Sequence, residues 1–252
     1  GHGFGASPIV YGDLLIVQND HEGDAALLAL DRATGETRWQ TPRTNDKVAY
    51  STPCVYQPPG GSDELIFNSG AHGISGVDPK TGEINWQLEV FDKRSVSSPV
   101  VAAGLVFGSC GSGAGGNYVV AVTPGNRARG FTPAETYRVD QSAPYVPTPV
   151  ARGDLMFLWS DKGVVTCIRP SSGEVVWRKR VGGDFFGSPV IAGDCVFCIS
   201  DDGEVVSIAA ADEYRLFGKM PLGEECRSTP AIADGTMYLR TISHLYAVGG
   251  AD

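Results

Sequence analysis

The chain has 252 residues, of which 42% are hydrophobic, and it carries a formal net charge of −9 at pH 7. An acidic chain without clustered Lys and Arg is poorly suited to phosphate backbones, so we expect no nucleic-acid binding. No apolar stretch approaches the roughly 20 residues that a helix needs to cross a membrane, so we expect no transmembrane segment. Its 33 glycines and 16 prolines instead supply the many turns of an all-β protein.

A Ser-Pro or Thr-Pro pair recurs six times along the chain and opens each predicted repeat unit. Each pair precedes two short apolar runs, which are usually joined by a tight turn such as Gly12-Asp13. Short apolar runs bounded by Gly, Asp and Pro predict antiparallel strands joined by hairpins. The units start near residues 7, 52, 98, 148, 188 and 229, and their prolines are 45, 46, 50, 40 and 41 residues apart.

A second phrase marks the far end of the unit and supports the same period. It reads small residue-x-Asp-x-x-Thr-Gly-Glu-x-x-Trp at residues 29–39 and again at residues 76–86, 47 residues later. A looser copy runs from Cys167 to Trp177. We expect a third strand to end near the Asp and a fourth strand to carry the Trp. Four strands in a repeat of about 40 to 45 residues predict a β-propeller blade.

An aromatic residue at the Trp position is expected in all five complete units. Where the phrase has decayed, counting ten residues on from Ala121 and from Ser207 gives Phe131 and Phe217. One large ring per unit favours packing against the neighbouring blade over a role in binding a cofactor. The structural aromatics predicted in this way are Trp39, Trp86, Phe131, Trp177 and Phe217.

The two motifs together resemble the PQQ-like repeat of quinoprotein-type β-propellers over essentially the whole chain. That family includes pyrroloquinoline quinone (PQQ) dehydrogenases and non-enzymatic, BamB-like outer-membrane assembly lipoproteins. The resemblance implies one all-β domain over residues 1–252, a propeller of four-stranded antiparallel blades. WD40 and kelch propellers are not indicated, because neither a Gly-His…Trp-Asp nor a paired-Gly signature recurs.

The last predicted unit stops after residues 245–248, so its Thr-Gly phrase and its outer strand are missing. PQQ-like propellers usually have eight blades, so the resemblance implies about two further blades upstream and a truncated N-terminus. Residues 1–6 contain nothing that could serve as a closing strand. A native six-bladed ring is therefore the less favoured alternative.

Irregular loops on one face of the predicted blades are the expected binding surface. The second-to-third hairpin and the crossover to the next blade emerge together on that face, whereas the opposite turns are short, apart from the one near Pro124. Arg and aromatic residues there, without an excess of Lys, indicate recognition of a protein or a small ligand, with ordinary solvated loops as the alternative. The candidates are His2, His21, Asp24, Arg43, His72, Asp92, Arg94, Tyr145, Asp184, Phe185 and Arg227.

No catalytic constellation is evident, and no metal site is expected, because Cys195 and Cys198 lie on opposite faces of one predicted strand. Together with these absences, the resemblance to BamB-like propellers implies a non-catalytic binding scaffold without a cofactor, exported to the periplasm. The resemblance leaves open a PQQ- and Ca²⁺-dependent alcohol or sugar dehydrogenase, or an accessory domain of a larger polypeptide. For the dehydrogenase, the possible Ca²⁺ ligands are Asp20, Asp24, Asp92 and Asp184, which match no family site. The adjacent-cysteine pair of many quinoprotein alcohol dehydrogenases is absent from the sequence.

Overall fold

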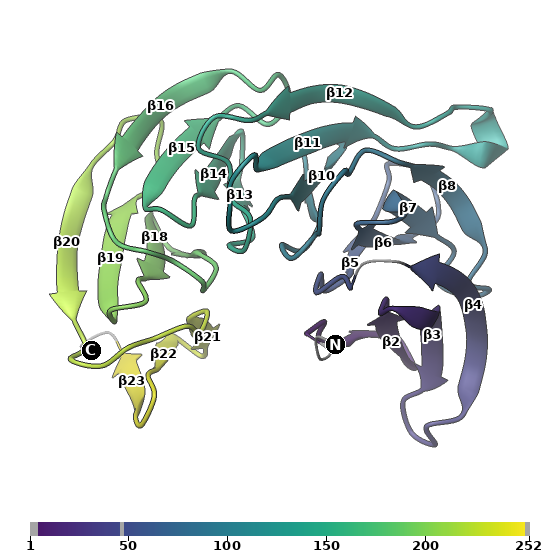
Figure 1. Cartoon of the computed structure of the whole chain (residues 1–252), viewed down its shortest axis with the longest axis horizontal. Coiled ribbons are helices and arrows are strands. Elements are labelled where there is room, and N and C mark those ends of the chain that lie inside the picture. Colours follow the sequence, from purple (N-terminus) through teal and green to yellow (C-terminus); the bar gives the residue numbers. More distant parts are fainter. Residues whose placement is uncertain (1–4, 46–47, 250–252) are drawn as a thin grey trace. The chain divides into compact units, whose positions relative to one another are not determined.

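A computed structural model describes residues 5–45 and 48–249 of the chain. In these residues the strands form six antiparallel sheets, and the only helical element is the 3-10 turn η1 (Arg127–Arg129). Strands that are consecutive in the chain are neighbours in each sheet (Figure 1). No helix in the described ranges is long and apolar enough to cross a membrane. The chain divides into two compact units, Gly1–Gln141 and Ser142–Asp252, which are described separately below.

The first unit contains three four-stranded sheets, named blades 1 to 3 in chain order. Blade 1 consists of β1 (Ile9–Tyr11), β2 (Leu14–Asn19), β3 (Gly23–Asp31) and β4 (Thr37–Asn45). Blade 2 consists of β5 (Cys54–Tyr56), β6 (Glu64–Ser69), β7 (Gly73–Val77) and β8 (Ile84–Leu88). Blade 3 consists of β9 (Val100–Ala102), β10 (Leu105–Cys110), β11 (Tyr118–Thr123) and β12 (Ala134–Val139).

The second unit contains two four-stranded sheets and one sheet in which three strands are described, named blades 4 to 6. Blade 4 consists of β13 (Val150–Arg152), β14 (Leu155–Trp159), β15 (Val164–Ile168) and β16 (Val175–Arg180). Blade 5 consists of β17 (Val190–Ala192), β18 (Cys195–Ile199), β19 (Glu204–Ala209) and β20 (Leu216–Pro221). Blade 6 consists of β21 (Ala231–Ala233), β22 (Thr236–Arg240) and β23 (Leu245–Gly249).

The Ser/Thr-Pro motif has a structural explanation in both units. Within each unit the backbone N–H of an opening Ser or Thr donates to the side-chain hydroxyl of the corresponding residue in the next blade of that unit. This hydroxyl ladder ties the first strands of adjacent blades together and explains why Ser or Thr recurs at the position. Its bonds join Ser7 to Thr52 (3.1 Å), Thr52 to Ser98 (3.2 Å), Thr148 to Ser188 (2.9 Å) and Ser188 to Thr229 (2.9 Å).

The Asp of the Thr-Gly phrase closes the turn between the third and fourth strands. In blade 1 the Asp31 carboxylate accepts the backbone N–H groups of Ala33 (2.9 Å) and Thr34 (2.8 Å). Gly35 then adopts a φ of 76°, in the left-handed region that favours glycine. The register of β3 and β4 shifts by one residue directly after this turn, which sets Trp39 opposite Ala29. The phrase therefore encodes a turn followed by a bulge, and the bulge sets which residue of β3 lies opposite the Trp.

Trp39, Trp86 and Trp177 are all buried in their outer strands. The indole Nε1–H of Trp39 donates to the Pro79 carbonyl of blade 2 (2.9 Å), and that of Trp177 donates to the Ala211 carbonyl of blade 5 (3.1 Å). The rings of Trp39 and Trp177 thereby join their blades to the turn between the third and fourth strands of the next blade.

Phe131 does not occupy the Trp position, so that prediction was wrong. Its side chain is 64% exposed and lies outside β12. The residue opposite Ala121 is Tyr137, whose ring centroid lies 6.1 Å from that of Phe107 in edge-to-face geometry. Blade 3 has a longer third-to-fourth connection, residues 124–133, so counting ten residues falls short of the position.

Phe217 was also predicted at the Trp position, and the strand register contradicts it. Ser207 pairs with Gly218, and Phe217 lies at the bulge with 45% of its surface exposed. The connection between the paired residues Ile208 and Leu216 is one residue longer than the corresponding connection in blade 4. A single inserted residue therefore turns the aromatic ring to the other side of the strand.

Candidate functional site

The irregular loops of the second unit are fixed by a chain of backbone hydrogen bonds. Each bond links a second-to-third hairpin of one blade to a crossover between blades. Backbone hydrogen bonds therefore fix the conformation of these loops independently of their side chains. The bonds run from Phe185 N–H to Asp161 O (2.9 Å), Asp201 N–H to Asp184 O (2.7 Å), Cys226 N–H to Asp201 O (2.9 Å) and Ile242 N–H to Glu225 O (3.2 Å).

Two of the predicted candidates lie at the blade 4 end of this chain of bonds. The backbone N–H of Tyr145 donates to the carboxylate of Asp161 (2.7 Å), so Tyr145 contributes its main chain to the order of the loop. Asp184 is exposed and pairs with Lys162 (2.9 Å), which raises the pKa of that lysine. An exposed pair of this kind contributes little stability, and its charges face solvent.

Phe185 was predicted as a binding residue, but it belongs to the core. Its side chain is 0% exposed, and its ring packs edge-to-face on Trp159 with centroids 5.3 Å apart. Its neighbour Phe186 points the other way and is 41% exposed. The sequence shows two adjacent aromatic residues, and burial of one ring in an extended segment leaves the other on the surface.

Arg227 is held against Phe186 by two interactions. Its guanidinium lies 5.1 Å from the centroid of the Phe186 ring. It also donates to Asp201 through Nε (2.7 Å) and Nη2 (3.4 Å), and this pairing raises the pKa of Arg227. Planar stacking combined with a two-point carboxylate contact restrains an otherwise flexible side chain. The result is an ordered surface formed by Phe186, Arg227 and Asp201.

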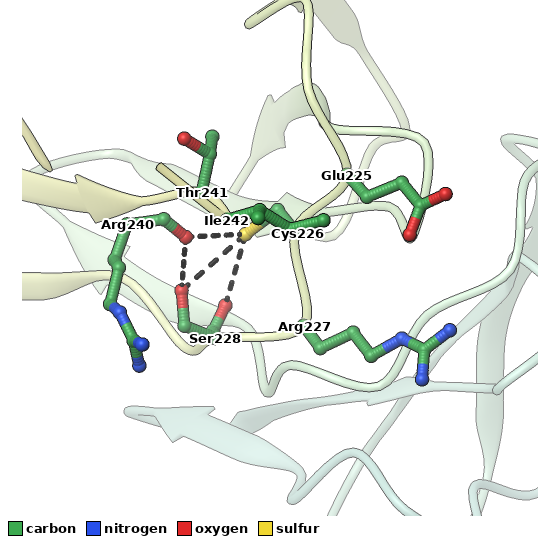
Figure 2. Close-up of a pocket in the computed structure, with 7 residues that line it drawn as sticks. All are labelled: Glu225, Cys226, Arg227, Ser228, Arg240, Thr241 and Ile242. Carbon is green, nitrogen blue, oxygen red and sulfur yellow. Dashed lines mark hydrogen bonds between the residues drawn. The ribbon is translucent and has the colours of Figure 1, made fainter. Parts of the chain in front are cut away.

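A pocket of about 410 Å³ adjoins Arg227 and is lined by residues 225–228 and 240–242 (Figure 2). The buried Cys226 is one of the lining residues, and its thiol lies 3.0 Å from the carbonyl oxygen of Arg240 and 3.4 Å from the Ser228 hydroxyl. Ile242 is the most exposed large hydrophobic residue among those described, at 73%. We call Phe186, Arg227, Ile242 and this pocket the interaction site. Phe186 and Ile242 were missed in the sequence because nothing in their local pattern distinguishes them from buried residues.

Glu224 fixes the blade 6 hairpin that carries Ile242. Its carboxylate accepts bonds from the hydroxyl of Ser243 (2.6 Å), the hydroxyl of Thr241 (2.7 Å) and the backbone N–H of Ser243 (3.1 Å), and it contacts His244 Nδ1 (2.8 Å). These bonds, with those of Ser243 and Thr241 foremost, lower the pKa of Glu224 to about 2. A charged Glu224 therefore holds the hairpin in one conformation.

Arg43 was predicted on the loop face of the first unit, and the structure places it inside. Strand β4 extends to Asn45, so Arg43 pairs with Ala25 within the sheet instead of standing in a loop. Its side chain is 1% exposed, and Nε lies 3.4 Å from the buried Asp20 carboxylate. Burial lowers the pKa of Arg43, and the charge of Asp20 opposes that effect. Arg43 is therefore not available to a partner at the surface.

The remaining candidates of the first unit are scattered over its loops. His72 Nε2 contacts the carbonyl of Thr44 (2.9 Å), and burial lowers its pKa. The Arg94 guanidinium lies 5.7 Å from the centroid of the Tyr50 ring. Asp92 accepts a bond from the Tyr118 hydroxyl (2.8 Å), which lowers the pKa of Asp92. His21 is half-buried with Nδ1 2.8 Å from the carbonyl of Glu22, Asp24 is exposed at the start of β3, and His2 lies outside the described residues.

Two of the four aspartates considered for calcium already pair with basic residues of the protein. Asp20 pairs with Arg43 and accepts from Gln18 (2.9 Å), and Asp184 pairs with Lys162. Within residues 5–45 and 48–249, no group of three or more His, Cys, Asp or Glu side chains is arranged to hold a metal ion.

Comparisons with known proteins agree with the blade pattern. The model of the family described as outer membrane protein assembly factor BamB matches residues 1–129 and 138–248. Among solved structures, the crystal structure of BamB from Moraxella catarrhalis is similar with a TM-score of 0.68 and 16% sequence identity. That similarity covers 95% of this chain and 67% of the other. The structural similarity confirms the predicted β-propeller architecture. A search of curated proteins gave no match.

Proposed function

The chain belongs to the family of outer membrane protein assembly factor BamB, and we propose that it is a non-catalytic scaffold that binds a protein partner. The family description further supports a role outside the cytoplasm, in the assembly of outer-membrane proteins. Export to the periplasm is part of the proposal. The dehydrogenase alternative is the less favoured hypothesis, because Asp20 and Asp184 each already form an ion pair with a basic residue.

The interaction site is the observation that carries this proposal. Exposed aromatic and Arg side chains beside a pocket are the usual composition of an energetic centre in protein interfaces. Phe186 and Arg227 are already ordered by stacking, so binding would cost little side-chain entropy. The exposed acidic residues Asp184, Asp202 and Glu225 lie on the same loops. The chemistry favours a partner segment that has an apolar anchor and basic flanks.

Site-specific photo-crosslinking in cells tests the proposal. A photoreactive residue at Ile242 should give an adduct with one protein of the cell envelope, and Phe186→Ala should abolish it. The matched control is a photoreactive residue at Val175, which is also apolar and exposed (44%) but lies on β16. Equal adducts from both positions, or an adduct that persists in Phe186→Ala, would refute the assigned surface. The proposal also expects no saturable heat when PQQ and Ca²⁺ are titrated into the protein.

A further inference from the structure

The boundary between blades 2 and 3 departs from the repeat in two adjacent loops. In the five other blades, two residues join the first and second strands: 12–13, 103–104, 153–154, 193–194 and 234–235. In blade 2 the same hairpin contains residues 57–63, so the prediction that only the turn near Pro124 departs from the short form was wrong. The third-to-fourth connection of blade 3 is also extended, to residues 124–133. Both insertions line one groove of about 730 Å³ within the first unit, a volume in the range of small-molecule sites.

The two walls of the groove are ordered. The Tyr11 hydroxyl donates to Asp63 (3.0 Å) and anchors the hairpin to blade 1. In the opposite wall, Asn126 caps η1 by accepting the backbone N–H of Arg129 (3.0 Å). Arg127 forms an ion pair with Glu83 of blade 2. The guanidinium Nη2 of Arg129 reaches to 3.8 Å from the position that a Cβ on Gly60 would occupy, so it spans toward the hairpin.

The floor of the groove holds a carboxylate where the repeat has no charge. Second strands begin with Leu14, Leu105, Leu155, Cys195 or Thr236 in the other blades, but with Glu64 in blade 2. Glu64 is 8% exposed. Its two oxygens accept from Trp86 Nε1 (2.7 Å) and Asn85 Nδ2 (2.8 Å). No Lys or Arg of the described ranges forms an ion pair with it.

Trp86 is redirected to hold this carboxylate. Trp39 and Trp177 donate to a carbonyl of the following blade, whereas Trp86 donates to Glu64 in its own blade. The extended connection of blade 3 packs directly on the ring. A Cβ at Gly125 would lie 2.7 Å from Cβ of Trp86, so glycine is required there by close approach. Two loop insertions, a buried carboxylate and a redirected indole therefore converge on the same groove.

The chemistry of the groove selects a ligand that both donates and accepts hydrogen bonds. A carboxylate has about four lone-pair sites, and the two N–H donors leave capacity for hydroxyl donors from a ligand. The Arg129 guanidinium and the Ser62 hydroxyl offer donors to ligand oxygens from the walls. The lining contains no large exposed apolar side chain of the kind that anchors a peptide. Vicinal hydroxyls of a sugar satisfy both requirements at once.

We propose that the groove between blades 2 and 3 binds a saccharide, with Glu64 accepting bonds from sugar hydroxyls and Arg129 donating to sugar oxygens. The groove belongs to the first unit and uses none of the residues of the interaction site. Saccharide binding and partner binding are therefore separable by mutation.

Saturation-transfer NMR on the whole chain tests the site with glucose, galactose, N-acetylglucosamine, cellobiose and chitobiose as separate probes. At a probe concentration of about 10 mM, at least one sugar should receive saturation from the wild-type protein. A site with a dissociation constant of about 1 mM is nearly filled at that concentration. Glu64→Gln and Arg129→Ala should each weaken binding about tenfold, the loss of one charged hydrogen-bonding partner. Arg152→Ala, which removes an Arg beside an ordinary two-residue turn, is the matched control and should bind normally.

A hairpin exchange covers the case in which Glu64→Gln unfolds the protein. Replacing residues 57–63 by Gly-Asp restores the ordinary two-residue turn. This variant should lose saturation transfer to the sugar and keep the melting temperature of the wild-type protein. Arg129 is exposed, so its substitution leaves the core unchanged. The proposal is wrong if no probe receives saturation from wild type. It is also wrong if transfer survives both Arg129→Ala and the hairpin exchange.

Discussion

Two blade boundaries show how one repeat serves two purposes. Between blades 4 and 5, Trp177 donates to the Ala211 carbonyl, the turn at 153–154 is short, and the core is apolar. Between blades 2 and 3, Trp86 turns to Glu64, and extended loops leave a polar groove. The regular boundary provides stability, whereas the irregular one gives up an interblade bond and gains a site. In a repeat protein, the departures from the repeat are the places to look for function.

The largest effect is expected from breaking the regular boundary at Trp177. Trp177→Ala should lower the free energy of unfolding by about 3–5 kcal/mol, because it removes a buried ring from the core. Urea denaturation measures this change. Phe217→Ala is the matched control, since the ring is exposed, and it should change stability by less than about 0.5 kcal/mol. A comparable loss in both variants would contradict the strand register of blade 5.

The contrast between Trp177 and Phe217 also shows what the sequence could predict. Blades 1 and 2 carry the full Thr-Gly phrase and blade 4 carries a looser copy with Ser172-Gly173, and there the motif identified the buried Trp in each case. Where the phrase has decayed, the position depends on connection length, and an insertion in blade 5 or blade 3 moves the aromatic. Local periodicity is encoded in few residues, whereas register depends on every residue between two strands.

The candidate binding residues were harder to predict for a related reason. Arg227 lies in an exposed loop, as the prediction required, and its binding role stays a prediction, but Phe185 was chosen where Phe186 is the exposed ring. Arg43 was placed in a loop because nothing in the sequence showed that β4 extends to Asn45. Whether a loop side chain faces solvent depends on contacts with segments far away in the chain, and local composition does not contain that information.

A smaller effect should follow from removing one bond of the hydroxyl ladder. Ser188→Ala leaves the backbone N–H of Thr148 without its acceptor and should cost about 1 kcal/mol of unfolding free energy. Ser171→Ala, on an exposed turn of blade 4, controls for the substitution itself and should be close to neutral. Chemical denaturation of both variants decides the matter. If Ser188→Ala were neutral as well, the hydroxyl ladder would be a consequence of blade packing and would not contribute to the free energy of unfolding.

The smallest effect is expected from Glu224 and depends on pH. The folded-state pKa of about 2 lies below the ordinary value of 4.5, so the charged carboxylate stabilises the fold. That contribution is fully present above about pH 4.5 and is lost as the pH falls toward about 2. Glu224→Gln should therefore reduce the free energy of unfolding slightly at neutral pH and leave it unchanged near pH 2. The difference between the wild-type and variant denaturation midpoints should shrink as the pH falls from about 4.5 to about 2. A constant difference would contradict the role of the charged Glu224.

The hydroxyl ladder has a direction, and this has a consequence for cooperativity. Every bond runs from the N–H of one blade to the hydroxyl of the next, so Thr52 and Ser188 each serve as acceptor for one neighbour and donor to the other. Such nearest-neighbour coupling makes each unit behave as a short one-dimensional array, in which opening one blade weakens the blades on either side. Amide exchange should therefore report groups of adjacent blades opening together within a unit, and not single strands detaching independently.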